Sequence, residues 1–194
     1  HWMRQPDLAK SLEVLAKGGA EAFYRGPFAR KLVQGVQRLG GVWTEDDLAN
    51  YRLVEREPIV ATYRGVRIVS APPPSSGGIW LASVLNILSG YDLASLDAAT
   101  RKHLVLEAMR RAHRDRAQYL GDPAFTEVPV ALLTSLDYAA GLRASIRPDR
   151  ATPSDLLPDY AGTEPQGQHT THFSIIDADG NRVAASITLN GWFG

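Results

Sequence analysis

Apolar side chains recur at every third or fourth position through much of the first 145 residues of the chain. This spacing places them on one face of an α-helix and predicts amphipathic helices. Glycine, proline and capping hydroxyl or acidic side chains mark where the helices begin and end. The expected helical ranges are 6–17, 20–39 with a break near 26–27, 44–51, 79–88, 98–120 and 132–142.

The spacing changes to every second residue in two places, which predicts β-strands. β-Branched side chains on both sides of Gly65 predict a first hairpin within residues 58–70. The runs 170–176 and 182–188 flank the sequence Asp-Ala-Asp-Gly-Asn, a turn by composition, and predict a second hairpin. We therefore expect an α+β fold in which the helices come first and a hairpin lies near the C-terminus.

Residues 71–78 read Ala-Pro-Pro-Pro-Ser-Ser-Gly-Gly and are expected to turn the chain. Three prolines fix φ and remove three N–H donors, so neither a helix nor a central strand can include them. Ser75 and Ser76 are expected to hydrogen-bond the backbone of this same loop. Asp122 is expected in the turn that ends the helix at 98–120.

The helix at 98–120 is expected to separate apolar from charged side chains. Its inward side carries Leu104, Leu106, Met109 and Ala112. Its other side carries Arg110, Arg111, Arg114 and Arg116. A run of charges on a helix is most simply a solvated face, so we expect these arginines to point to solvent.

The composition of the 194 residues narrows the possible functions. With 21 basic and 21 acidic side chains the formal net charge is zero, so the chain lacks the charge of a general nucleic-acid binder. It has no cysteine, which excludes disulfides, a thiolate nucleophile and a zinc site built on sulfur. No apolar run approaches the roughly 18 to 20 residues that span a bilayer. His103 and His113 lack acidic partners at ligand spacing, so we expect no metal site and no cofactor.

Residues 149–169 are rich in Pro, Asp, Thr and Gly and predict a long, flexible, exposed loop. Thr170 lies where this loop meets a strand, a place where cutting the chain would expose an N-terminal threonine. Such a residue can be a nucleophile because its own α-amine, with an ordinary pKa of about 7.7–8.0, can act as the base.

A second threonine strengthens this interpretation. If the hairpin is symmetric about Asp179, Thr170 pairs with Thr188, and two hydroxyl side chains meet across the strands. The plain alternative is that threonine simply suits β-strands. His172 lies beside the candidate nucleophile, but its place in the strand favours a hydrogen-bonded, half-buried histidine over a general base.

Together with other segments, the hairpin resembles the γ-glutamyltransferase (γ-glutamyltranspeptidase, glutathione hydrolase) family of N-terminal-nucleophile hydrolases. The similarity runs over essentially all 194 residues. The segments that carry it are 5–9, 40–41 with 46–48, 63–65, 72–78, 119–123, 170–174 and 179–181. The resemblance implies a four-layer αββα sandwich, of which this chain would be an incomplete fragment.

The resemblance also implies a precursor that cuts itself between His169 and Thr170. Residues 1–169 would then be the C-terminal part of a large subunit, and residues 170–194 the start of a small one. Thr170 would attack a γ-glutamyl amide such as that of glutathione, and the acyl group would pass to water, an amino acid or a dipeptide. Thr188 matches the threonine that hydrogen-bonds the nucleophile, and Asn190 matches the asparagine that contacts the substrate's α-amino group.

Two alternatives remain open at this point. An acylase of the same fold would act on another amide, such as a cephalosporin side chain or poly-γ-glutamate. An unprocessed, non-catalytic fragment would be only a folded piece. Intact mass distinguishes the last alternative from the first two, because only a processed chain is cut.

The chain starts at His1 without an initiator methionine and stops abruptly at Gly194, which predicts a piece of a longer protein. The family places its substrate-binding arginine upstream of this region and its acid, paired serines and Gly-Gly oxyanion donors downstream. We therefore expect this fragment alone to be inactive, because it lacks the oxyanion hole. By resemblance the whole protein would be periplasmic or extracellular.

Overall fold

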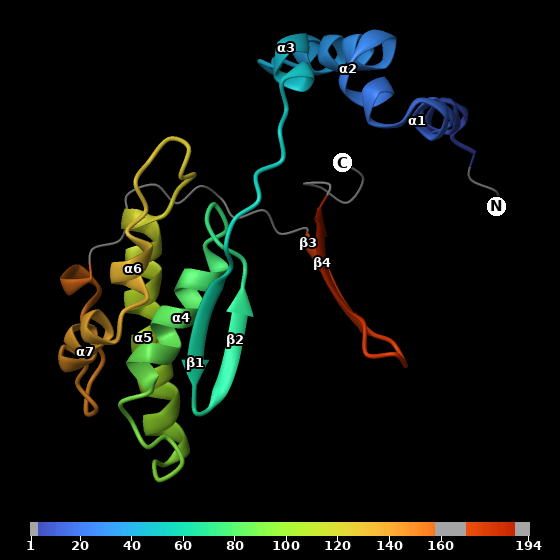
Figure 1. The fold of residues 1–194 in the computed structure, drawn as a ribbon. Helices are drawn as coiled ribbons and strands as arrows, with labels where there is room; N and C mark the ends of the chain where they lie inside the picture. Colours follow the sequence, from blue (N-terminus) through green and yellow to red (C-terminus); the bar gives the residue numbers. More distant parts are fainter. Residues whose placement is uncertain (1–3, 158–169, 189–194) are drawn as a thin grey trace. The chain divides into compact units, whose positions relative to one another are not determined.

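The structure is a computed structural model, and it describes residues 4–157 and 170–188 (Figure 1). The chain divides into two compact units, residues 1–56 and residues 57–194. The cleavage point expected from the sequence lies inside the second unit, so this division differs from that between the expected subunits.

The first unit consists of the helices α1 (Pro6–Tyr24), α2 (Gly26–Arg38) and α3 (Glu45–Ala49). Gly19 is non-helical (φ 58°, ψ −149°), so the helix is interrupted at the glycine pair where the sequence predicts a stop, and α1 comprises two helical segments on either side of this kink. The further break predicted near residues 26–27 is also found, because Arg25 is extended between α1 and α2. Thr44 caps α3, as the sequence predicts.

The core of the first unit is small. Its buried side chains are Ala29, Val33 and Leu48. The rings of Tyr24 and Tyr51 stack beside them with their centroids 5.4 Å apart. Because α1 contributes no buried residue, most of the burial in this unit comes from the amphipathic helix α2.

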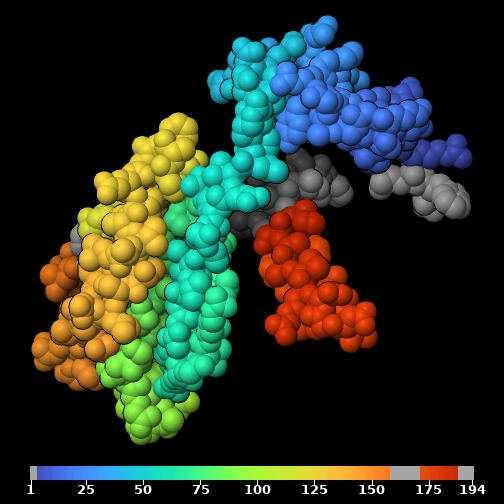
Figure 2. All heavy atoms as spheres, viewed as in Figure 1, coloured from blue at the N-terminus to red at the C-terminus, as the bar shows by residue number. Residues whose placement is uncertain are grey.

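The second unit begins with an antiparallel hairpin that packs along a group of helices (Figure 2). Its elements before the second hairpin are β1 (Ile59–Tyr63), β2 (Val66–Ser70), α4 (Gly77–Leu88), α5 (Ala98–Tyr119), α6 (Val130–Leu133), α7 (Leu136–Ala144) and the 3₁₀ helix η1 (Ser154–Leu156). The mostly apolar helix α4 lies at the centre, in contact with α5, α7 and β1. The main core consists of Val84, Ile87, Leu88, Leu104, Ala108, Ala112, Ala139, Leu142 and Ile146.

Two details of these helices differ from the sequence prediction. The single helix expected at 132–142 is two short ones, because the chain turns after Leu133 and Ser135 then caps α7 by accepting a hydrogen bond from the Tyr138 amide. Leu106 is 58% exposed rather than buried, which shows that the apolar face of α5 is narrower than its spacing suggests.

The prediction of a solvated arginine face on α5 is wrong. Arg111 is only 1% exposed, and Arg110, Arg114 and Arg116 are partly buried. The prediction of an exposed loop holds for most of residues 149–157, but Thr152 is partly buried, residues 154–156 form η1 and Leu157 is buried. This segment supplies polar partners to Arg110 and Arg111, which helical periodicity cannot reveal. Residues 158–169 lie outside the described residues.

The second hairpin is formed by β3 (Thr170–Ile176) and β4 (Arg182–Thr188). Its register matches the prediction, with Thr170 opposite Thr188 and Phe173 opposite Ala185. The described residues thus contain helices and two separate two-stranded antiparallel sheets, which is consistent with the expected α+β class.

Candidate active site

The candidate site is centred on the threonine pair of the second hairpin. Thr170 begins β3 and Thr188 ends β4, and the backbone register places the two residues directly opposite each other. The other two residues expected at the site, His169 and Asn190, lie outside the described residues. The structure therefore brings together the expected nucleophile and its expected threonine partner.

The two faces of this hairpin differ in polarity, since successive strand residues point to opposite sides. One face carries His172, Ser174 and Ser186. The opposite face carries Phe173, Ile175, Val183, Ala185 and Ile187. After a slip of one residue in the register, Thr170 would no longer pair with Thr188.

His172 is exposed, not half-buried as expected from the sequence. Its Nδ1 lies 2.9 Å from the hydroxyl oxygen of Ser186, and its Nε2 lies 3.2 Å from that of Ser174. Both ring nitrogens are engaged by serine hydroxyls, and Ser174 lies further along β3 from Thr170. This arrangement favours a structural role for the ring over that of a general base.

The register is held at the other end of the hairpin by the turn at residues 177–181. One carboxylate oxygen of Asp177 accepts hydrogen bonds from the backbone amides of Asp179 (3.0 Å) and Asn181 (2.8 Å). The other oxygen accepts from the side-chain amide of Asn181 at 2.8 Å. These hydrogen bonds, that of the Asn181 side chain first, lower the pKa of Asp177. Gly180 supplies the positive φ of 84° that the turn needs.

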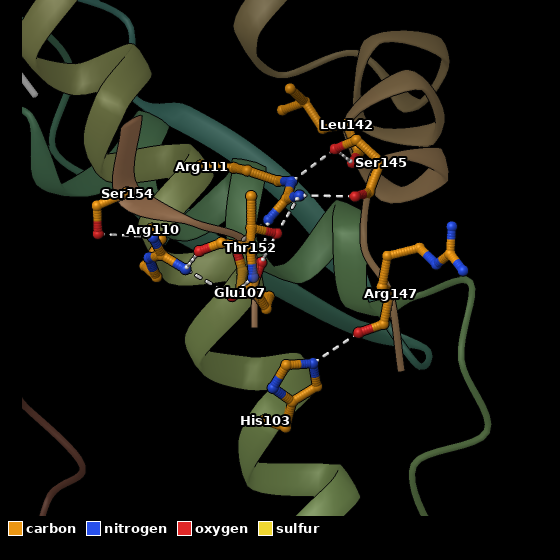
Figure 3. Close-up of polar contacts among 9 residues, drawn as sticks. All are labelled: His103, Glu107, Arg110, Arg111, Leu142, Ser145, Arg147, Thr152 and Ser154. Atoms are coloured by element: carbon orange, nitrogen blue, oxygen red, sulfur yellow. Dashed lines mark hydrogen bonds and ion pairs between the residues drawn. The ribbon is translucent and has the colours of Figure 1, made fainter. Parts of the chain in front are cut away.

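The sequence analysis did not predict a polar cluster centred on the buried side chains of Glu107 and Arg111 of α5 (Figure 3). We call it the Glu107 cluster, and its members are Glu107, Arg110, Arg111, Ser145, Thr152 and Ser154. Glu107 and Arg111, four residues apart on the helix, form an ion pair of 2.6 Å. This spacing was the available signal, but on an exposed helix face it is worth only a few tenths of a kcal/mol, about 0.2–0.5.

The charge of Glu107 is strongly stabilised. Burial raises the pKa of this carboxyl group, but hydrogen bonds from Thr152, Arg111 and Arg110 outweigh it and bring the pKa to about 2. The carboxylate accepts hydrogen bonds from two arginines and from both the amide and the hydroxyl of Thr152, so Glu107 stays ionised across the neutral range.

Other expectations about polar residues have mixed outcomes. The hydroxyl of Ser76 accepts a hydrogen bond from Nε of Arg116 at 2.9 Å, so it contacts α5, whereas the sequence predicted a contact with the backbone of its own loop. Asp122 lies in the turn after α5, where it accepts from the amide of Ala124, as expected.

In residues 4–157 and 170–188, no group of three acidic or histidine side chains could hold a metal ion. No helix within the same residues is long and apolar enough to cross a membrane.

Comparison with known proteins decides which family these features belong to. The family model described as gamma-glutamyltranspeptidase matches residues 1–194. The chain belongs to the γ-glutamyltranspeptidase family. This confirms the resemblance drawn from the sequence motifs, and it places the chain in a family of enzymes.

Members of the γ-glutamyltranspeptidase family and related acylases are similar over nearly the whole chain. A glutathione hydrolase proenzyme of Pseudomonas sp. (strain A14) is 45% identical over 98% of the chain and 33% of its own length. An acylase ACY 1 proenzyme of Pseudomonas sp. (strain SE83) is 43% identical over 98% of the chain and 34% of its own length. The crystal structure of Helicobacter pylori gamma-glutamyltranspeptidase has a TM-score of 0.75 and 40% identity, covering 84% of this chain and 48% of that one. The chain thus spans about a third of the length of these curated relatives.

Proposed function

We propose that this chain is the central part of a proenzyme that hydrolyses or transfers γ-glutamyl groups, with Thr170 as its nucleophile. The observation that carries the proposal is the position of Thr170 at the start of a strand, directly opposite Thr188. Membership of the γ-glutamyltranspeptidase family, and the proenzyme names of its relatives, support the same conclusion.

The first step is self-cleavage. The hydroxyl oxygen of Thr170 attacks the carbonyl carbon of His169, the peptide C–N bond breaks, and the proton moves to the nitrogen that becomes the α-amine. Water then hydrolyses the new ester and releases a carboxylate on His169. The products are a large subunit that ends at His169 and a small subunit that begins at Thr170.

The second step uses the released amine. The α-amine of Thr170 takes the hydroxyl proton while the oxygen attacks the γ-carbonyl of a γ-glutamyl amide such as glutathione. The amide C–N bond breaks, its amine leaves with the proton, and a γ-glutamyl ester remains on Thr170. Water then gives hydrolysis, whereas an amino acid or dipeptide gives transpeptidation.

The α-amine is the better candidate for the base than the neighbouring histidine. Both nitrogens of His172 already lie within hydrogen-bond distance of Ser174 and Ser186. A free N-terminal amine has an ordinary pKa of about 7.7–8.0, so a useful fraction is unprotonated at neutral pH. The mechanism needs no metal or cofactor.

The remaining parts of the proposal concern residues around the nucleophile. Thr188 hydrogen-bonds Thr170 and steadies it, and Asn190 contacts the α-amino group of the γ-glutamyl substrate. The described elements belong to an αββα sandwich of the N-terminal-nucleophile hydrolases that other parts of the proenzyme complete. The whole protein is exported to the periplasm or the cell exterior.

A second candidate function is an acylase that acts on another amide. The observation that favours it is the acylase ACY 1 proenzyme, whose 43% identity is close to the 45% of the glutathione hydrolase proenzyme. The two functions share the threonine and differ in the pocket. If the complete proenzyme releases the aniline from a γ-glutamyl anilide, the result supports the first function. If it releases no aniline but hydrolyses the side-chain amide of a cephalosporin, the result supports the second.

Intact mass of the purified chain tests self-cleavage. We expect two fragments that meet between His169 and Thr170, and only the uncut chain in the Thr170→Ala variant. Thr171→Ala is the matched control, because it removes the next hydroxyl along β3 from the opposite face and should still be cut. Thr170 would be excluded as the nucleophile if the Thr170→Ala variant were cut at the same bond. It would also be excluded if both the parent chain and the complete proenzyme remained uncut.

A further inference from the structure

A cavity of about 290 Å³ lies beside α5 in the second unit. We call it the Trp80 cavity, after the residue that α4 contributes to its wall. The other lining residues come from α5, from η1 and from the residue that follows η1. The apolar part of the lining consists of Trp80, Leu106, Met109 and Leu157. The volume is close to the lower end of the range for small-molecule pockets, about 300–1,000 Å³.

The polar part of the lining is basic. It consists of Arg110, His113, Arg114 and Ser154. No acidic side chain of the described residues lines the cavity. Because His113 and Arg114 follow Arg110 by three and four positions, these side chains lie on one side of α5. An occupant of the cavity therefore meets both apolar and basic groups.

Buried carboxylates hold the two arginines in place. Nη1 of Arg110 donates to Oε1 of Glu107 at 2.7 Å. Nε and Nη2 of Arg114 donate to Oδ1 of Asp115 at 3.1 and 2.8 Å. The two carboxylate residues are 2% and 3% exposed, whereas the arginine side chains are 32% and 28% exposed. Because the guanidinium groups are already oriented from the interior, an anion that binds them loses little affinity to side-chain ordering.

Hydrogen-bond donors remain on the basic side of the cavity. A guanidinium group has five N–H donors. Nη1 of Arg110 donates to Glu107 and to the carbonyl of Thr152, and Nη2 donates to the hydroxyl of Ser154 at 3.3 Å (Figure 3). Nε of Arg110 donates to no described residue. His113 is exposed and forms no hydrogen bond or ion pair with a described residue.

These features favour a ligand with one negative charge and an apolar body. Each guanidinium group already faces one carboxylate, so the cavity offers less positive charge than a multiply charged phosphate requires. The indole and aliphatic walls also disfavour a strongly hydrated anion that has no apolar part. A carboxylate is the single charge that arginine binds with well-matched geometry.

We propose that the Trp80 cavity binds a small carboxylic acid in its ionised form. The carboxylate faces Arg110 and His113, and the apolar body lies against Trp80 and Leu157. The proposal is independent of the proposed function, because no residue of this cavity takes part in self-cleavage or in γ-glutamyl transfer.

NMR titration of the isotope-labelled Thr170→Ala chain tests the site. The two probes are 3-phenylpropionate and 3-phenylpropanamide, which share an apolar body and differ in charge. The acid should shift the indole N–H signal of Trp80 and the amide signals of residues 106–114. It should bind about tenfold more tightly than the amide, because charge-assisted hydrogen bonds are about twice as strong as neutral ones. Acetate, which lacks the apolar body, should bind about tenfold more weakly than the larger acid.

Variants of the lining separate the charge from the apolar wall. Arg110→Gln should weaken binding of the acid about tenfold and leave binding of the amide unchanged. If Arg110→Gln fails to fold because Glu107 loses a partner, His113→Ala replaces it, since His113 has no described partner to lose. Leu106→Ala should weaken both probes equally. Leu136→Ala is its matched control, because Leu136 is similarly exposed, 65% against 58%, and lies outside the cavity.

A free acid and an acidic side chain elsewhere in the complete proenzyme share this chemistry. If the probe binds the chain and the complete proenzyme with the same affinity, the occupant is a free acid. If it binds the chain alone, the occupant is a carboxylate of the proenzyme itself. Absence of binding to the chain, equal binding of acid and amide, or tighter binding of inorganic phosphate would overturn the proposal. A parent protein that never cuts itself would overturn the proposed function and change none of these affinities.

Discussion

Two glycines of the second unit should respond to the same substitution with opposite sign. Gly78 is buried near the start of α4, and a β-carbon there would overlap the carbonyl oxygen of Ala71 and press on Ile59 at 3.1 Å. Gly141 lies in α7, and a β-carbon there would meet nothing within 4 Å. Neither glycine has a positive φ, so the difference comes from packing and not from backbone strain.

The magnitudes follow from the neighbours. Overpacking costs about 1–3 kcal/mol, and the obstacle at Gly78 is backbone, which no rotamer change can move aside. Alanine regains about 0.5–1 kcal/mol of helix preference at either site. We therefore expect Gly78→Ala to lose about 2 kcal/mol of unfolding free energy and Gly141→Ala to gain about 0.5–1 kcal/mol.

Thermal unfolding followed by circular dichroism measures both changes. For a chain of this size 1 kcal/mol shifts the melting temperature by about 2–4 °C, so Gly78→Ala should melt about 4–8 °C lower. Gly141→Ala should melt a few degrees higher, about 1–4 °C. A Gly78→Ala protein as stable as the parent would refute the close approach of α4 to the loop at 71–78. A destabilised Gly141→Ala protein would refute the open environment of α7.

Two further predictions concern the carboxylates described above. The pKa of Glu107 is about 2 in the folded chain against an ordinary value of 4.5, so the unfolded chain binds the extra proton first as the pH falls. The stability that depends on Glu107, about 3 kcal/mol, should be complete above pH 4.5 and disappear toward pH 2, and urea unfolding of Glu107→Gln should lack this dependence on pH. In the second hairpin, Asp177→Ala removes three hydrogen bonds from the turn and should speed amide hydrogen exchange along β3 and β4, while Asp179→Ala, which keeps its backbone donor, should not. Equal exchange in the two variants would show that the turn does not hold the register.

The helices and hairpins can be predicted from the sequence because the capping residues, turn residues and apolar spacing that define them lie within a few residues of one another. Thr44 caps α3, and the alternation around Asp179 gives the register that pairs Thr170 with Thr188. Both depend on neighbours in the sequence. The prediction of a single helix at 132–142 is wrong for a local reason too, since Ser135 caps a new helix within this apolar run.

The Glu107 cluster could not be predicted in this way. Arg111 contacts Ser145, 34 positions away, and Glu107 contacts Thr152, 45 positions away. From the sequence alone, an arginine on a helix is equally compatible with water or with a buried carboxylate. Only the path of residues 145–157 along α5 decides between them, and the sequence of that segment has no periodic pattern.

The number of residues in the turn at 177–181 determines which residues pair at the candidate site. The threonine pair lies at the open end of the hairpin, and only the number of positions between Thr170 and Thr188 decides which residues meet there. Insertion or deletion of a single residue in the turn would replace Thr188 opposite Thr170 by a neighbour from the other face. Substitutions that keep both the length of the turn and the hydrogen bonds of Asp177 leave the pair aligned. The length of the turn is therefore a property that sequence change in this protein must preserve.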